Sequence, residues 1–252
     1  MSSDLPAGFI RFEVDDAQVV CADYVADAVR RALDAGTLYE YAANDPTHRK
    51  LSGRGVTYAT TLPFDVERAV VRRSRHGGMF GSITGEIFRY PTRAPHELET
   101  SERLRRAGVA TPTMLGYVRY PAFPGFCRVD VMSREVPDSF DLSTVLMDAA
   151  PTRRDEAWRA TQRLVISLNE IGARHHDLNV KNVLLRHGLH GGLEALVLDV
   201  DRVEFVRTDG AAASANAARL LRSAKKWQTE HGAPISDAEL AALAALLRQA
   251  LA

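Results

Sequence analysis

Apolar residues recur at regular spacings along most of the chain, and these spacings predict its elements. From Val20 to Ala32 an apolar side chain returns every four residues, which predicts a helix over residues 17–35 that ends at Gly36. The rest of the first fifty residues is weakly patterned. An extended segment is expected over residues 51–61, where two glycines interrupt it.

A short strand and a helix come next. The apolar run 69–71 is typical of a strand, and it follows a turn that contains Pro63. Residues 95–107 predict a helix, because Pro95 suits a first helical position and Gly108 suits a C-terminal stop. Two more strands and a linker are expected over residues 117–120, 127–132 and 137–140.

The chain changes character after this linker. Apolar residues then follow mostly helical periods, and the Ala-rich tail keeps a leucine stripe that favours a helix over disorder. The elements expected here are helices over 142–147 and 155–171, strands over 183–186 and 196–200, and helices over 212–227 and 236–251. A mostly β half therefore precedes a mostly α half, which indicates an α+β protein with two lobes, residues 1–136 and 137–252.

The composition of the chain excludes few classes of protein. The chain of 252 residues has 32 Lys and Arg against 32 Asp and Glu, so its net charge gives no argument for a nucleic-acid partner. Cys21 and Cys127 are the only cysteines, which suits a reducing compartment. No secretory leader or membrane-spanning run is visible in the pattern, so we expect a cytoplasmic protein.

The strongest chemical signal is the stretch 175–185, His-His-Asp-Leu-Asn-Val-Lys-Asn-Val-Leu-Leu. Asp177 and Asn182 stand five residues apart, and Asp199 follows the apolar run 195–198. This layout is typical of a kinase active site, where the first Asp takes the proton of an acceptor hydroxyl. The Asn and the later Asp then hold Mg²⁺ at the phosphates of ATP. A carboxylate after a buried strand also costs free energy unless it pairs or binds metal.

Other residues of this stretch have more than one interpretation. His175 stands where it could brace the loop, and Lys181 could steady the transferring phosphoryl group or simply be solvated. The adjacent histidines, His175 and His176, raise the alternative of a zinc site. Neighbouring side chains rarely point at one metal, however, and no further Cys or His recurs at ligand spacing.

The phosphates of ATP need cations and close backbone amides, and the first half of the chain offers both. Gly53 and Gly55 are the candidates for a phosphate flap, although such a pair more often marks only a turn. Arg72 stands on the strand where a protein kinase has a lysine, and Glu97 on the following helix is its expected partner. Arg72 could instead belong to a solvated basic surface, and Glu99 or Glu102 could take the place of Glu97.

At this point the chain resembles the lipopolysaccharide kinase family, which comprises the 3-deoxy-D-manno-octulosonic acid (Kdo) kinases and the core heptose kinases. The resemblance extends from about residue 53 to residue 226. It rests on motifs in a fixed order: Arg72–Gly78, Thr92–Glu97, Ala107–Pro112, His175–Leu185, Leu198–Arg202 and Asn216–Ser223. One departure is Val200, where the family usually has Phe.

The resemblance implies a two-lobed, protein-kinase-like fold with a β-rich N-terminal lobe, one Glu-bearing helix, a hinge near residues 133–137 and a small helical C-terminal lobe. It implies the cofactors ATP and Mg²⁺, with a lipid-linked inner-core sugar as acceptor, most of all Kdo. It also implies peripheral contact with the cytoplasmic face of the inner membrane. Basic residues such as Arg73, Arg75, His76 and Arg93 could then contact anionic groups of the acceptor or the leaflet.

Two other functions stay open from the sequence. One is a kinase of the same fold that acts on another small hydroxylated metabolite. The other is a weakly active nucleotide-binding regulatory module, which Arg72 and Val200 suggest because both depart from the usual residues. The presence of Asp177, Asn182 and Asp199 together favours an enzyme.

Overall fold

The computed structural model describes residues 5–51, 55–75, 85–148, 150–188, 191–207 and 211–249. Gly53 of the predicted phosphate flap lies outside these residues. The chain divides into two compact units. The first contains residues 1–102 and 113–135, and the second contains residues 103–112 and 136–252.

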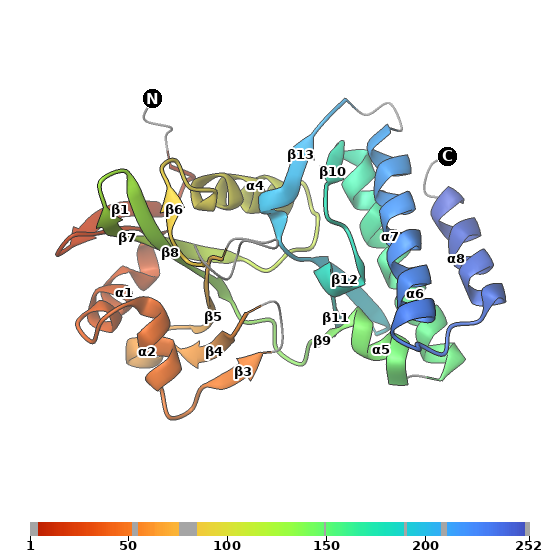
Figure 1. Cartoon of the computed structure of the whole chain (residues 1–252), viewed down its shortest axis with the longest axis horizontal. Coiled ribbons are helices and arrows are strands. Elements are labelled where there is room, and N and C mark those ends of the chain that lie inside the picture. Colours follow the sequence, from red (N-terminus) through yellow and green to blue (C-terminus); the bar gives the residue numbers. More distant parts are fainter. Residues whose placement is uncertain are drawn as a thin grey trace. The chain divides into compact units, whose positions relative to one another are not determined.

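The first unit is built on one antiparallel sheet (Figure 1). Its strands are β1 (Phe9–Val14), β2 (Ala17–Ala22), β3 (Arg49–Leu51), β4 (Thr57–Thr61), β5 (Arg68–Arg73), β6 (Phe88–Arg89), β7 (Met114–Phe123) and β8 (Phe126–Arg134). They are ordered β1-β2-β7-β8-β5-β4-β3, with β6 paired to β8. The hairpin β3–β4 and the strand β5 are therefore neighbours in the sheet.

Helices cover both faces of this sheet, because alternate residues of each strand point to opposite sides. Helices α1 (Ala26–Leu33) and α2 (Leu38–Asn44) pack on the face that contains Val19 and Cys21. Helix α4 (Ala94–Arg106) packs through Leu98 on the face that contains Val20. Figure 1 shows α1 and α2 on one side of the sheet and α4 on the other.

The helix predicted over residues 17–35 is wrong in its first part. Residues 17–22 form strand β2, which pairs with β1 and β7, and only residues 26–33 form helix α1. Val19, Val20 and Cys21 are all fully buried, so both faces of this strand are covered. A strand buried on both faces has a continuous apolar run, and such a run cannot be distinguished from a helix by spacing alone.

In its described part, the second unit contains the end of α4, four further α-helices and two small sheets. The helices are α5 (Leu142–Asp148), α6 (Pro151–Glu170), α7 (Ala211–Glu230) and α8 (Asp237–Gln249). Strands β9 (Phe140–Asp141), β11 (Val183–His187) and β12 (Leu193–Val197) form one sheet, and β10 (Ala173–His175) pairs with β13 (Val203–Phe205). The predicted strand 196–200 ends early, at Val197, and residues 200–202 form a 3-10 turn.

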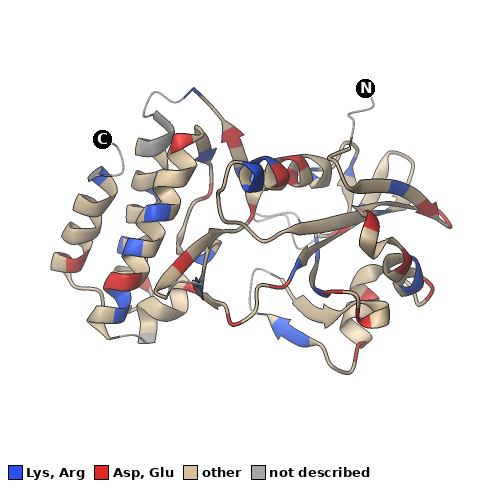
Figure 2. Ribbon diagram, turned by 180° about the vertical axis from the view of Figure 1, so that it is seen from behind, with Lys and Arg blue, Asp and Glu red and all other residues tan. Residues whose placement is uncertain are grey.

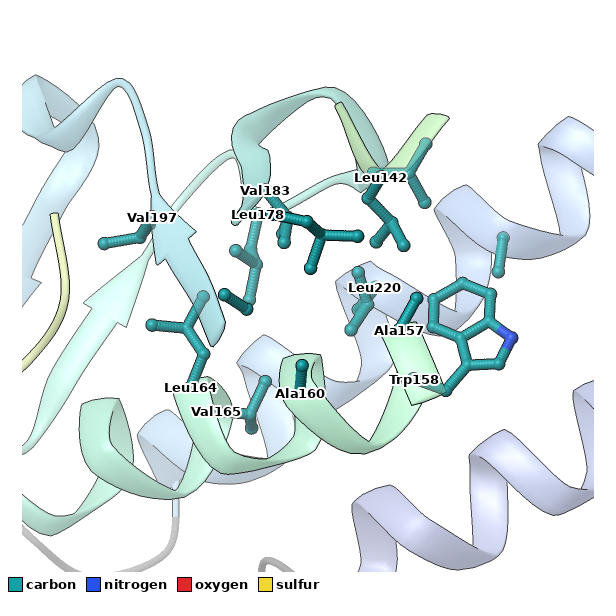
Figure 3. Close-up of a cluster of buried hydrophobic side chains, with 14 of the residues drawn as sticks. Leu142, Ala157, Trp158, Ala160, Leu164, Val165, Leu178, Val183, Val197 and Leu220 are labelled. Carbon is teal, nitrogen blue, oxygen red and sulfur yellow. The ribbon is translucent and has the colours of Figure 1, made fainter. Parts of the chain in front are cut away.

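The core of the second unit lies directly beneath the stretch that carries the candidate catalytic residues. Figure 3 shows Leu164 and Val165 of α6 and Leu220 of α7 among its buried side chains. Leu178 and Val183 belong to the same cluster, and both lie within the 175–185 motif. Tight packing of these side chains fixes the backbone on which the polar residues of the motif stand.

The segment 103–112 joins this second core although it precedes most of the second unit in sequence. Leu104 and Val109 are buried in the core, and Ala110 accepts a hydrogen bond from Val197 N at 3.0 Å. The Thr111 hydroxyl donates to Val197 O at 2.9 Å. Among the described residues, none of the helices has the length and apolar character needed to span a membrane.

Candidate active site

His175 connects the two parts of the motif within the second unit. Its buried imidazole donates through Nε2 to Leu198 O at 2.9 Å, and its Nδ1 accepts the Asp177 N–H at 3.1 Å. Both contacts together require the neutral tautomer with its proton on Nε2. Burial lowers the pKa of His175 below its ordinary value, which favours the same neutral form. The ring therefore ties the Asp177 loop to the residue that precedes Asp199.

A second set of contacts folds the loop so that Asp177 and Asn182 are neighbours. The Asp177 carbonyl accepts hydrogen bonds from Asn182 Nδ2 at 2.8 Å and from Asn179 Nδ2 at 2.9 Å. The side-chain oxygen of Asn179, Oδ1, in turn accepts the Lys181 N–H at 2.9 Å. Two side-chain amides thus hold the loop closed behind the Asp177 carboxylate.

Asp199 is brought to the same place by backbone pairing. Val183 stands opposite Val197 in the β11–β12 ladder, and beyond it Leu198 N donates to Asn182 O at 3.0 Å. Asp199 is the next residue, so the described structure gathers Asp177, Asn182 and Asp199. The expectation that Asp199 would be buried is wrong, because the strand ends at Val197 and Asp199 is exposed.

The backbone of Asp199 is strained. Its φ of 53° and ψ of 48° lie in the left-handed region, which residues other than Gly seldom adopt. Such conformations cost free energy and cluster at functional sites. This strain, rather than burial, is the structural peculiarity of Asp199.

Helix α7 braces the loop through two polar residues whose role the sequence did not show. Asn216 is fully buried, accepts the His175 N–H at 2.9 Å and donates to Ala173 O at 2.9 Å. The Ser223 hydroxyl accepts the Val180 N–H at 3.1 Å. A buried Asn in an otherwise apolar stripe was the available signal, since such a residue must find hydrogen-bond partners.

Lys181 lies at the solvent side of this loop. It is exposed, and its Nζ is 5.7 Å from the centre of the Trp227 ring on α7. Burial raises the pKa of the nearby Asp141 carboxyl, and the charge of Lys181 opposes that rise. Asp141 is therefore a half-buried acid near the loop that sequence reasoning missed.

In the first unit, Arg72 and Glu97 form the predicted ion pair. Arg72 Nη2 donates to Glu97 Oε1, from strand β5 to the first turn of α4. Glu97 is thus a residue that holds Arg72. Figure 2 shows acidic residues followed by basic residues along α4, an order that complements the helix dipole.

Arg73 points to the opposite face, as strand alternation predicts. Its guanidinium pairs with the fully buried Asp130 at 2.9 Å and donates to the Thr37 hydroxyl at 2.8 Å. Burial raises the pKa of Asp130, whereas the bond from Arg73 opposes that rise. Arg73 is therefore part of an internal network at the start of α2. The suggestion that it contacts an acceptor or a leaflet is not supported, and Arg75 is paired with Glu86 at 2.8 Å.

Gly55 follows the described end of β3 and precedes β4. A Cβ added there would lie 3.5 Å from Arg75 Cδ, which is an ordinary contact. Packing within the described chain therefore does not require glycine at this position. Close approach of a ligand to the backbone is a separate reason for a glycine at position 55.

The histidine pair does not form a zinc site. His176 pairs with Glu204 at 2.9 Å, whereas His175 is used inside the loop. The described part of the chain has no group of three or more His, Cys, Asp or Glu residues that could hold a metal. A magnesium ion needs less from the protein, because one or two side-chain ligands and the phosphates of its substrate suffice. The Asn182 amide fits this role, since its nitrogen is fixed on Asp177 O and its oxygen is left as an acceptor.

The fold defines the class of protein. The structure described as "WaaP in complex with acyl carrier protein" aligns with 87% of this chain and 86% of its own, with a TM-score of 0.52 and 16% identity. This likeness shows a kinase-like fold, as the sequence predicts. The model of the lipopolysaccharide kinase (Kdo/WaaP) family matches residues 44–247, and the chain belongs to this family.

Curated relatives are similar over part of their length. Those named 3-deoxy-D-manno-octulosonic acid kinase include proteins of Actinobacillus succinogenes and Haemophilus influenzae strain PittEE. The first is 29% identical over 139 residues, which is 53% of this chain and 57% of the relative. The second is 29% identical over 157 residues, 60% of this chain and 64% of the relative. The chain thus spans less than two thirds of these relatives.

Proposed function

We propose that this protein is a kinase that transfers the γ-phosphoryl group of ATP to a hydroxyl of a lipopolysaccharide inner-core sugar, namely Kdo. The observation that carries the proposal is the gathering of Asp177, Asn182 and Asp199 by His175 and the β11–β12 ladder. Membership of the Kdo/WaaP family and the names of the relatives support the choice of acceptor.

In this proposal Asp177 orients the acceptor hydroxyl and takes its proton. The hydroxyl oxygen then forms a bond to the γ-phosphorus, the bond from that phosphorus to the β–γ bridging oxygen breaks, and ADP leaves with the electron pair. His175 keeps the Asp177 backbone in place through its Nδ1 contact. Lys181 is the flexible cation beside the loop that can approach the transferring group.

The first unit would bind the phosphates of ATP. Gly53 and Gly55 supply backbone amides, and Arg72, held by Glu97, supplies the cation. An arginine fork can bind phosphate oxygens in pairs, so the pairing with Glu97 supports Arg72 in the role usually taken by lysine. Asn182 and Asp199 would hold Mg²⁺, which when bound neutralises charge on the phosphates.

Val200 does not argue for an inactive module. Its side chain is 5% exposed and lies in the core of the second unit. A smaller apolar residue therefore occupies the position after Asp199 without leaving it unpacked. We further propose that the protein meets its lipid-linked acceptor at the cytoplasmic face of the inner membrane.

The test is phosphorylation of a lipid A precursor with and without Kdo, with Mg²⁺ and ATP, followed by mass spectrometry for one added phosphoryl group. We expect a product only when Kdo is present, and its loss in Asp177→Asn. The control Asp155→Asn changes an exposed acid on α6 and should stay active. Equal product from Asp177→Asn and the unaltered protein would refute the mechanism.

A further inference from the structure

Helix α7 presents a row of cations beside the loop that carries Asp177. We call Arg219, Arg222 and Lys226 the α7 cation strip. They stand at positions i, i+3 and i+7, which places them on one side of a helix. The remaining question is how this side is oriented relative to the loop.

The contacts of α7 fix that orientation. Asn216, Ser223 and Trp227 lie within about 20° of one line along the helix, given about 3.6 residues per turn. All three contact the loop: Asn216 accepts from His175 N, Ser223 from Val180 N, and Trp227 lies near the Lys181 ammonium. This line therefore faces the loop that carries Asp177.

The strip borders that line on its solvent side. Arg219 and Lys226 lie about 60–80° from the line by the same helical geometry, and Arg222 about 120° from it. The buried residues Leu220 and Ala224 lie on the other side of the line, in the core. Around the helix, the residues buried in the core are thus followed by the residues that contact the loop, and these are followed by the cations of the strip.

The strip has little compensating charge among the described residues. No described carboxylate forms an ion pair with Arg219 or Arg222, and Lys226 has only the exposed Glu230 at 3.5 Å. An exposed pair of this kind contributes little. Like charges at these spacings also repel one another and destabilise the helix. Lys225, on the far side of α7, instead pairs with Asp237.

We propose that the α7 cation strip binds an oxyanion of the acceptor, so that Arg219 and Lys226 position its hydroxyl at Asp177. This inference rests on the proposed function and names the substrate group that the site recognises. The oxyanion is the carboxylate of the sugar acid or a phosphate of the attached lipid. Both fit a guanidinium fork beside an ammonium group.

The test compares steady-state kinetics of the full chain with Arg219→Gln, Lys226→Gln and the matched control Lys225→Gln. Loss of one charge-assisted contact should raise the KM for the acceptor by about 10- to 100-fold in the first two variants. The KM for ATP should stay unchanged, and Lys225→Gln should match the unaltered protein. Arg219→Lys keeps the charge and should recover part of the loss, and melting temperatures confirm that each variant is folded.

Two altered acceptors identify the oxyanion. If the strip binds the carboxylate, an acceptor with that carboxylate as its methyl ester should have a KM with the unaltered protein that is raised as much as by Arg219→Gln. When Arg219→Gln is assayed with the methyl ester, the KM should rise no further. If a lipid phosphate is bound, removal of that phosphate should show this pattern instead. If the effects of Arg219→Gln and of the altered acceptor on the KM are fully additive for both acceptors, the proposal is overturned.

Other outcomes also decide the matter. An unchanged acceptor KM in Arg219→Gln, with the unaltered protein active, would refute the strip but leave the proposed function intact. If Arg219→Gln and Lys226→Gln weaken binding to anionic vesicles that contain no acceptor as much as they raise the acceptor KM, the strip binds the membrane instead. If the unaltered protein phosphorylates no acceptor, the proposed function fails. Calorimetric binding of a Kdo glycoside and of the dephosphorylated and phosphorylated lipids to the same variants then decides the inference.

Discussion

At the scale of single residues, the site depends on His175 as much as on the acids it holds. Its neutral ring is shared between Leu198 O and the Asp177 N–H, so a second proton would remove the acceptor for Asp177 N. The spacing of Asp177, Asn182 and Asp199 was readable from the sequence because it is local. The exact use of both ring nitrogens was not, since Leu198 is far along the chain and only folding brings it to the ring.

The first prediction concerns pH. The pKa of His175 is lowered from 6.5 in the folded protein, so the unfolded chain binds more protons at mildly acidic pH. The contribution of this ring to stability is therefore complete above about pH 6.5 and falls as the pH drops toward the folded-state pKa. Urea unfolding from pH 8 to pH 5 should show this loss in the unaltered protein. The slope should be smaller in His175→Gln, and identical slopes would contradict the assignment.

The second prediction concerns the strain at Asp199. Glycine adopts its left-handed backbone freely, so Asp199→Gly should leave the free energy of unfolding equal or raise it by up to about 1 kcal/mol. Under the proposed function, phosphoryl transfer should nevertheless be lost. Denaturant unfolding and the kinase assay measure the two effects. The control Asp201→Gly lies in a 3-10 turn and should lower stability by about 0.5–1 kcal/mol. A lower free energy of unfolding in Asp199→Gly would contradict a strained backbone at Asp199.

At the scale of elements, sequence patterns predicted an element correctly where a single apolar helix face packs on the rest of the protein. The helix expected over residues 95–107 is α4, because its caps and its apolar stripe agree. The pattern failed for β2, whose burial on both faces depends on α1, α4 and the rest of the sheet. It also missed α2, although Thr37 and Glu40 form a capping box that was visible in the sequence.

The third prediction concerns α7 as the support of the loop. Asn216→Ala would leave the His175 N–H and the Ala173 carbonyl unpaired in the core, at a cost of about 2–4 kcal/mol. Asn216→Asp keeps the acceptor for His175 N and loses the donor to Ala173 O, so it tests the two bonds separately. Thermal unfolding should rank the unaltered protein above both variants. A variant Asn216→Ala as stable as the unaltered protein would mean that α7 does not brace the loop.

At the scale of the whole molecule, the division into two units does not follow the sequence order. The second unit takes residues 103–112 before the chain completes the first. Sequence patterns could not show this, because the elements on either side of the segment look continuous. The assignment rests on tertiary contacts alone, namely the burial of Leu104 and Val109 and the bonds between Val197 and residues 110 and 111.

The fourth prediction follows from these contacts. Residues 137–252 alone would lose two buried apolar side chains, each contributing about 1.5–3 kcal/mol, and should not unfold cooperatively. Restoring residues 103–112 through a short Gly-Ser linker should recover a cooperative transition. The linker can be short because Arg134 N donates to Thr113 O at 2.7 Å, so the ends of the omitted segment are close. Cooperative unfolding of residues 137–252 by themselves would contradict this.

The same chain path limits how the protein can change over evolutionary time. A recombination event near residue 136 separates residues 103–112 from the rest of their core, so neither product inherits a complete set of packing partners. An exchange that preserves both units must replace two separate stretches of the gene at once. Lineages of this fold should therefore diverge by substitution within each unit and by insertion in surface turns, rather than by exchange of one half for another.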